Sequence, residues 1–344
     1  MAITIELDNQ FEQRVPHRTT RGDAAGGKQG PWLLSLAMWL NLLRLVGPDG
    51  TRAGDLENAG GNLAGMERWG WVRSTPQAAG ERPTAQLRRD RIVHASAAGR
   101  LAASTWPGLL AEVERRWRAR FGAERVRALR ESLAAALREL DLELPEYLPV
   151  LGYGLRAKLP SFGLSRAGSD ASLPTLLAQV LLAFTLEYER ESQLALAISA
   201  NVTRPLGAGP MALRELPRAA GISKEAIAMA VGFLERQGVV GLERDPVGRG
   251  KRVGLTAKGH VWTERDARLL ADTEQAWLAL ARSGAIADLR AALEAIVGDP
   301  AAEPQLLWAG LEPYPGSCRA SLPRPLTLPH YPTVLHRGGY PDGS

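Results

Sequence analysis

The sequence predicts a mainly α-helical fold of the α+β class, in which small β-hairpins accompany two related helical units. Two observations predict it. In the second half of the chain, residues 211–252 carry the signals of two short helices followed by two short strands. In addition, several segments recur 160 positions apart, as Trp117 and Trp277 do. A repeat of this kind indicates that one structural unit occurs twice.

The stretch 211–252 opens with the pattern of two helices joined by a tight turn. Gly221 is expected to end the first helix in the left-handed conformation, and Ser223 is expected to cap the second. Ile222 and Ile227 flank that cap and predict a hydrophobic staple. Apolar residues then recur at helical spacing and predict one buried stripe. They are Ile227, Ala230, Val231 and Leu234.

The opposite face of the second helix is small and polar, and a basic hairpin follows it. A helix with a short outer face can lie close in the major groove of DNA, where residues near its N-terminus reach base edges. Residues 239–242 and 252–255 predict paired strands, joined by a loop at 245–250. Basic residues in and beside such a loop suit phosphate contacts, which position a protein on DNA without recognising its sequence.

The segments LRELPRAAGISKEAIAMAVGFLERQGVV and GKRVGLTAKG resemble the winged helix-turn-helix of MarR-type transcription regulators. The whole chain resembles a longer, actinobacterial-style regulator with two such units in tandem. The resemblance implies sequence-specific binding of double-stranded DNA and a small-molecule effector that relieves repression. Residues expected to face the major groove are Ser223, Lys224, Glu225, Ala228 and Met229. Residues expected to hold the DNA backbone are Arg249, Lys251 and Arg252.

The internal repeat extends over most of the chain and predicts a tandem of two winged-helix units. Its matches keep one order along the sequence, which chance would rarely produce. The matched segments are 39–44 with 199–204, 91–99 with 251–259, and 144–151 with 328–335. We expect the units to be either an intrachain pseudo-dimer or, because one recognition helix looks intact, half of a homodimer formed through a helical layer.

The first unit differs from the second where the recognition helix should lie. Its segment ENAGGNLAGMERWGW, residues 57–71, is short and rich in glycine. Because glycine costs about 1 kcal/mol per helical position relative to alanine, we expect the first unit to recognise bases poorly. Its wing, residues 74–90, is longer and carries Arg82, Arg88 and Arg89. Phosphate contact and an ordinary solvated hairpin remain equal alternatives for that wing.

Composition shifts divide the chain into five predicted regions. Residues 1–30 are polar and glycine-rich, without a sustained period, and are expected to be a flexible arm. The first winged-helix unit is expected at 31–144, a connection rich in proline and glycine at 145–174, and the second unit at 175–298. Residues 299–344 are expected to form an irregular tail.

The composition excludes several classes of protein. A net charge of +5 modestly favours an acidic partner. One cysteine, Cys318, excludes an intrachain disulfide framework. The most apolar run, 31–46, contains Asn41 and Arg44, so no membrane span is expected. The N-terminus has no signal-peptide pattern, so a cytoplasmic protein is expected. We expect no enzyme, cofactor or metal site, because no catalytic motif occurs.

Tryptophan is concentrated in the first unit and suggests a pocket for an aromatic effector. The candidate pocket residues are Trp32, Trp39, Trp69, Trp106 and Trp117. Ordinary core packing is the alternative, since aromatic residues dominate cores. Two other functions also stay open: a ligand sensor or protein-interaction adaptor that keeps the winged-helix fold without binding DNA, and a DNA-acting enzyme such as a glycosylase.

Overall fold

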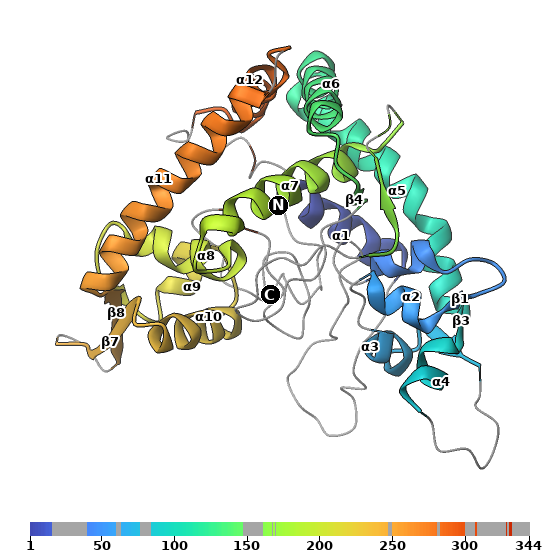
Figure 1. Ribbon diagram of the computed structural model, residues 1–344, viewed down its shortest axis with the longest axis horizontal. Helices are drawn as coiled ribbons and strands as arrows, with labels where there is room; N and C mark the ends of the chain where they lie inside the picture. The colour runs from blue at the N-terminus through green and yellow to red at the C-terminus, as the bar shows by residue number, and fades with distance from the viewer. Residues whose placement is uncertain are drawn as a thin grey trace.

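The computed structural model describes residues 1–15, 40–59, 63–75, 84–146, 161–166, 168, 170–246, 250–280, 283–299, 307, 328 and 330–331. Helices dominate these residues, and the strands form small antiparallel sheets (Figure 1). The predicted fold class, mainly α with small β-sheets, is confirmed. Within this described part, no helix is both long enough and apolar enough to cross a membrane.

The first half of the chain consists of short helices, one three-stranded sheet and two long helices. Its sheet has the strand order β1-β3-β2 and is antiparallel throughout. The elements are α1 (Ala2–Arg14), η1 (Leu40–Leu45), β1 (Thr51–Arg52), α2 (Ala53–Asn58), α3 (Leu63–Arg68), β2 (Val72–Ser74), α4 (Ala85–Asp90), β3 (Ile92–Ala95), α5 (Ala97–Phe121) and α6 (Ala123–Leu140).

The second half has the same order of sheet and long helices. Its sheet has the order β6-β8-β7, again antiparallel. The elements are α7 (Leu173–Glu191), α8 (Leu196–Leu206), β6 (Met211–Ala212), α9 (Leu216–Ala220), α10 (Lys224–Arg236), β7 (Val240–Arg244), β8 (Lys251–Leu255), α11 (Ala257–Leu280) and α12 (Ala285–Val297). Between the halves, β4 (Leu144–Pro145) pairs with β5 (Leu164–Ser165).

Both halves join their sheet to the following long helix in the same way. A Cβ built on Gly99 would lie 2.2 Å from the carbonyl oxygen of Trp71, and one built on Gly259 would lie 2.0 Å from that of Val239. The backbone N–H of each glycine donates to the hydroxyl group three residues earlier, which belongs to Ser96 just before α5 and to Thr256 just before α11. Only glycine therefore allows the strand and the helix to approach so closely.

The two halves lean together as the sides of an inverted V (Figure 1). Helices α6 and α12 pack against each other at the apex, and α7 crosses between the halves below them. Leu129 and Leu133 of α6 share one hydrophobic core with Ile286 and Leu289 of α12. The two hairpin-bearing ends lie at the two feet of the V, on the same side of the molecule.

Helix α1 corrects the expectation of a flexible arm for residues 2–14. Ile5, Leu7 and Phe11 are at most 2% exposed, and the helix packs against α5. Its buried Glu6 carboxylate accepts a hydrogen bond from the Trp117 indole at 2.8 Å and pairs with Arg120 at 3.0 Å. The helix is hard to predict because its burial extends to polar faces, which removes the usual helical period. Residues 16–30 lie outside the described part.

The first wing also departs from the expected hairpin. After β2, the described residues form α4, whose first turn is capped by Thr84 accepting the Leu87 N–H at 3.1 Å. Arg89 donates to the Asn58 side chain of α2 at 2.9 Å, and Arg52 pairs with Asp90. The solvated hairpin is therefore wrong for residues 84–90, because a capped helix packs there against α2. Arg82 lies outside the described residues.

Tyr331, in the region expected to be an irregular tail, is 2% exposed between α7 and α8. Asn201 of α8 forms two hydrogen bonds to its backbone, donating to the carbonyl at 2.8 Å and accepting the N–H at 3.0 Å. The Tyr331 hydroxyl lies 3.0 Å from the Thr185 hydroxyl of α7. This segment therefore connects the second winged-helix end to the helix that crosses between the halves.

Candidate nucleic-acid interface

The turn before α10 has the geometry that the sequence predicts. Gly221 is left-handed, with φ of 70°, and ends α9. The Ser223 hydroxyl accepts the Ala226 N–H at 3.1 Å and caps α10. Ile222 and Ile227 are both buried in the core of this end. The predicted helix end, cap and staple are confirmed.

The stripe predicted for α10 is also confirmed, whereas the helix before it is shorter than expected. All four residues of the stripe are buried: Ile227, Ala230, Val231 and Leu234. Before α10, Met211–Ala212 forms the third strand of the sheet, and the first helix begins only at Leu216. The residues between them do not continue the helix, since the N–H of Leu213 bonds to the carbonyl of Lys251 in the wing.

Four of the five residues predicted to meet the major groove reach the surface of α10. The Lys224 side chain is 82% exposed and lies 3.9 Å from the half-exposed Glu225 carboxylate. Met229 is 38% exposed, and Ala228 beside it is exposed as well. Ser223 is different, because it is 8% exposed and its hydroxyl is occupied by the cap. Its burial weighs against a direct base contact.

The wing is a regular antiparallel pair of strands. Lys251 lies opposite Arg244, and Arg252 lies opposite Glu243. Arg252 donates to the carbonyl of Pro210 at 2.7 Å, so its guanidinium is held beside the sheet. Lys251 and Arg244 are exposed. Arg249, the third predicted backbone contact, lies outside the described residues.

A hollow of about 420 Å³ separates the start of α10 from the wing. Its lining includes three basic residues, Arg214, Lys224 and Lys251, and one acidic residue, Asp245. Arg214 is 69% exposed, and its partner within 4 Å is Glu215. The sequence interpretation missed Arg214, because the residue lies in the turn between β6 and α9 and its place at the hollow depends on the wing. The balance of charge around this hollow suits an anionic ligand.

The corresponding end of the first half has a much shorter helix. α3 has six residues, against thirteen in α10, and its Leu63, Gly65 and Met66 are buried. Its exposed basic groups include Arg68 at the end of α3 and Arg88 and Arg89 of α4. This end therefore presents basic side chains without a long helix that could enter a groove.

Three tryptophans of the predicted pocket lie in the part of the chain that the structure describes. Trp69 lies under the Arg68 guanidinium at 5.5 Å, and Trp106 under that of Arg44 at 5.2 Å. Trp117 lines a large central cavity that neither of them lines. Trp32 and Trp39 fall outside the described residues. No cluster of three or more potential metal ligands is found among the residues that the structure describes.

Comparisons with known proteins add one distant similarity. A crystal structure of a MarR mutant from E. coli, complexed with operator DNA, matches with a TM-score of 0.27 and 18% identity. The match covers 33% of this chain and 83% of that chain. No protein-family model matches the chain, and no curated protein does. Because the similarity is this low, the function proposed below rests on the geometry of the two winged ends.

Proposed function

We propose that this protein is a transcription regulator that binds double-stranded DNA sequence-specifically and responds to a small-molecule effector. The observation that carries the proposal is the exposed start of α10, which lies beside a basic hollow and an exposed wing. Lys224, Glu225, Ala228 and Met229 would meet base edges in the major groove. Lys251, Arg252 and Arg214 would contact phosphates and position the helix.

We further propose that the chain is a tandem duplication that acts as an intrachain pseudo-dimer. The strand register supports this. Thr51 pairs with Val93 in the first sheet, and the residues 160 positions further along, Met211 and Val253, pair with each other in the second sheet. The packing of α6 against α12 joins the halves without a second molecule. One chain would then bring two winged ends to the same duplex, so a homodimer is not needed to span the site.

The two ends would contribute unequally to DNA binding. The thirteen-residue α10 would recognise bases, whereas the first end would hold phosphates through the basic side chains of α4. We therefore expect a DNA site with one sequence-specific half and one half in which the sequence matters little. Phosphate contacts alone give affinity that falls with salt but carry no sequence information.

The test is binding to labelled DNA from upstream of the protein's own gene across a salt series. Lys224→Ala combined with Arg214→Ala should weaken specific binding at least tenfold, since good base contacts contribute about 1–3 kcal/mol each. A matched control is Arg127→Ala, which removes a 60% exposed arginine from α6 at the apex. If the wild-type protein bound the upstream DNA and random DNA with the same affinity, sequence-specific recognition would be contradicted.

A second candidate is a ligand sensor or adaptor that keeps the fold without binding DNA. The short α3 favours it, because one of the two ends has lost the helix that DNA recognition needs. Under this candidate, wild type would show no salt-dependent binding to any duplex. The same salt series therefore separates the two functions.

A further inference from the structure

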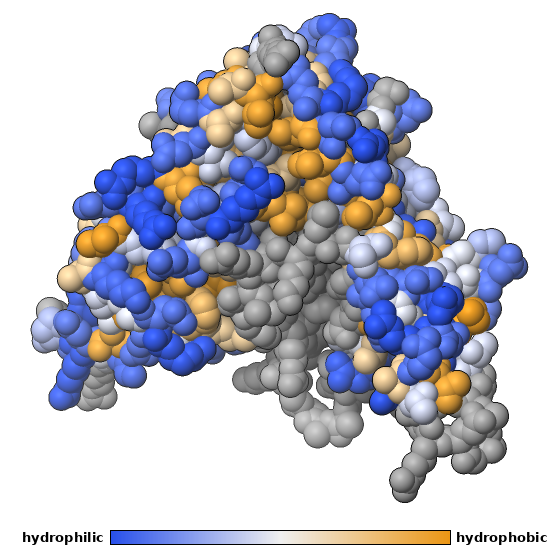
Figure 2. Space-filling view, viewed as in Figure 1, coloured by the Kyte–Doolittle hydropathy of each residue, from blue (hydrophilic) through white to orange (hydrophobic). Residues whose placement is uncertain are grey.

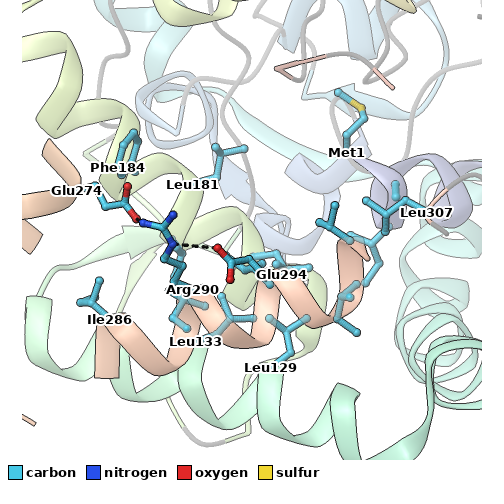
Figure 3. Close-up of a pocket in the computed structure, with 18 of the residues that line it drawn as sticks. Met1, Leu129, Leu133, Leu181, Phe184, Glu274, Ile286, Arg290, Glu294 and Leu307 are labelled. Atoms are coloured by element: carbon cyan, nitrogen blue, oxygen red, sulfur yellow. Dashed lines mark hydrogen bonds and ion pairs between the residues drawn. The ribbon is translucent and has the colours of Figure 1, made fainter. Parts of the chain in front are cut away.

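A cavity of about 1110 Å³ lies where the two halves of the chain meet. Its walls come from both halves: Leu129 and Leu133 of α6 face Leu181 and Phe184 of α7, with α12 closing one side (Figure 3). On the outside, hydrophobic side chains gather between α12 and α6 (Figure 2). The cavity is therefore apolar and reachable from solvent.

The lining is suited to an aromatic or alicyclic ligand. Trp117 of α5 and Trp277 of α11 contribute to the walls, and the Trp277 ring meets Phe184 edge to face at 5.4 Å. Pockets that bind small molecules usually have volumes of roughly 300–1,000 Å³ and mainly apolar walls with a few polar groups. This cavity lies slightly above that range, so it can hold a large ligand.

The charged side chains of the cavity lining are concentrated at one place. Arg290 of α12 pairs with Glu274 of α11 at 2.6 Å and with Glu294 at 3.0 Å (Figure 3). Two carboxylates against one guanidinium leave one negative charge at the rim. An ammonium group on a bound ligand would balance that charge, whereas a carboxylate would be repelled.

We propose that this cavity binds an apolar cation, with its ring system between the tryptophans and its amine at Glu274 and Glu294. A ligand there touches both halves, so it binds one relative orientation of the halves better than others and shifts the population toward it. Through that shift it changes the affinity for DNA. The ligand site stands on the cavity alone, whereas this regulation rests on the proposed function.

Three pyrene probes that differ in one substituent test the site: pyrenemethylamine, pyrenemethanol and pyrenecarboxylate. Energy transfer from the tryptophans to bound pyrene reports binding. The amine should bind most tightly and the carboxylate most weakly, by about threefold or more, because partly exposed charge pairs contribute up to roughly 1 kcal/mol. Equal affinities, tighter binding of the carboxylate, or no binding would overturn the ligand chemistry.

Two sets of variants locate the probe. Leu181→Trp places a bulkier ring beside Phe184 inside the cavity and should weaken binding, while Leu280→Trp adds the same ring at a position that is 69% exposed and should leave binding unchanged. Glu274→Gln combined with Glu294→Gln leaves Arg290 unpaired, so the preference should reverse in favour of the carboxylate. Glu294 is exposed and the Glu274 side chain is 37% exposed, so this variant should fold. An unchanged preference would overturn the assignment of the rim.

Regulation is tested by repeating the DNA titration with and without pyrenemethylamine. The proposal expects DNA affinity to change about threefold or more with the probe, and to change less in Leu181→Trp at the same probe concentration. If the probe binds but the affinity for DNA does not change, the proposed regulation is overturned and the proposed ligand site stands. Absence of probe binding to a protein that binds DNA normally would overturn the site and leave the proposed function. Absence of DNA binding without any probe is a failure of the proposed function itself.

Discussion

The two winged ends have the same sheet and the same junction to a long helix, yet they differ in the helix that would meet DNA. Strand order β1-β3-β2 corresponds to β6-β8-β7, and Gly99 corresponds to Gly259. In the second end, α10 has thirteen residues and a capped start; in the first, α3 has six. The difference teaches that the residues that hold the fold and those that would contact DNA can change independently.

The largest expected effect tests the shared junction. Gly99→Ala and Gly259→Ala each place a Cβ about 2 Å from a backbone carbonyl oxygen that has little room to move. Each should lower the free energy of unfolding by about 2–3 kcal/mol, the upper part of the range for overpacking. Gly108→Ala, in α5 with open space around it, should stabilise by about 0.5–1 kcal/mol. Urea unfolding measures all three; a tolerated change at either junction would break the equivalence of the two ends.

The caps of the two ends should differ in energy. Ser223→Ala removes the hydroxyl that accepts the Ala226 N–H in a helix with a buried stripe, and should cost about 1 kcal/mol. Thr84→Ala removes the cap of α4, which has no buried residue, and should cost about 0.5 kcal/mol. Chemical denaturation compares them. Equal losses would show that α4 supports the fold as much as α10 does.

A smaller effect concerns the phosphate contacts proposed for the first end. Arg88→Ala should reduce the slope of log affinity against log salt by about 1 and weaken all DNA sequences alike. Competition between specific and random duplexes measures both quantities, with Arg127→Ala as the control at the apex. A loss confined to the specific duplex would mean that the first end also recognises bases.

The smallest effect is a pH dependence that arises from Asp266 in the second half. Burial raises the pKa of the Asp266 carboxyl, which accepts a hydrogen bond from Tyr188. Because the folded protein holds this proton more tightly than the unfolded chain, stability falls as pH rises from the ordinary value of 3.8 through the raised pKa. The position 160 residues earlier is Trp106, which does not titrate.

Asp266→Asn should remove this loss, so its unfolding free energy should fall less than that of wild type between acidic and neutral pH. Urea unfolding at a series of pH values measures the difference. Trp106→Phe provides the control in the first half and should leave the pH dependence unchanged. An unaltered profile in Asp266→Asn would assign the titration to another group.

Short-range sequence patterns predicted the turn and helix around α10 well, but they did not predict how distant segments such as α1 and α5 pack together. The turn at Gly221, the cap at Ser223 and the apolar stripe of α10 depend on neighbours in the sequence, so their pattern was sufficient. Helix α1 was missed because its apolar Ile3, Ile5 and Leu7 alternate, and its polar Glu6 is stabilised by α5 from over 100 residues away. Such long-range pairing leaves no local period.

Only part of the candidate site could be predicted, because some of its residues are placed by tertiary structure and not by neighbours in the sequence. The exposed residues of α10 follow from helical spacing, whereas Arg214 reaches the hollow through the turn after β6, and Ser223 is buried by the cap that the sequence predicted. The tryptophan count suggested a pocket, yet the cavity joins Trp117 to Trp277 and to helices far apart in the sequence. Composition cannot show which of these aromatic residues meet.

Because α6 packs against α12 within one chain, the assembly of the two halves does not depend on protein concentration, and a mutation changes one half at a time. Two helices joined by a continuous polypeptide meet at a high effective concentration, so dilution does not separate them. In a homodimer, every substitution in a DNA-contacting helix appears twice. Here a substitution in α10 leaves α3 untouched, so under the proposed function each half of the molecule could acquire its own DNA target.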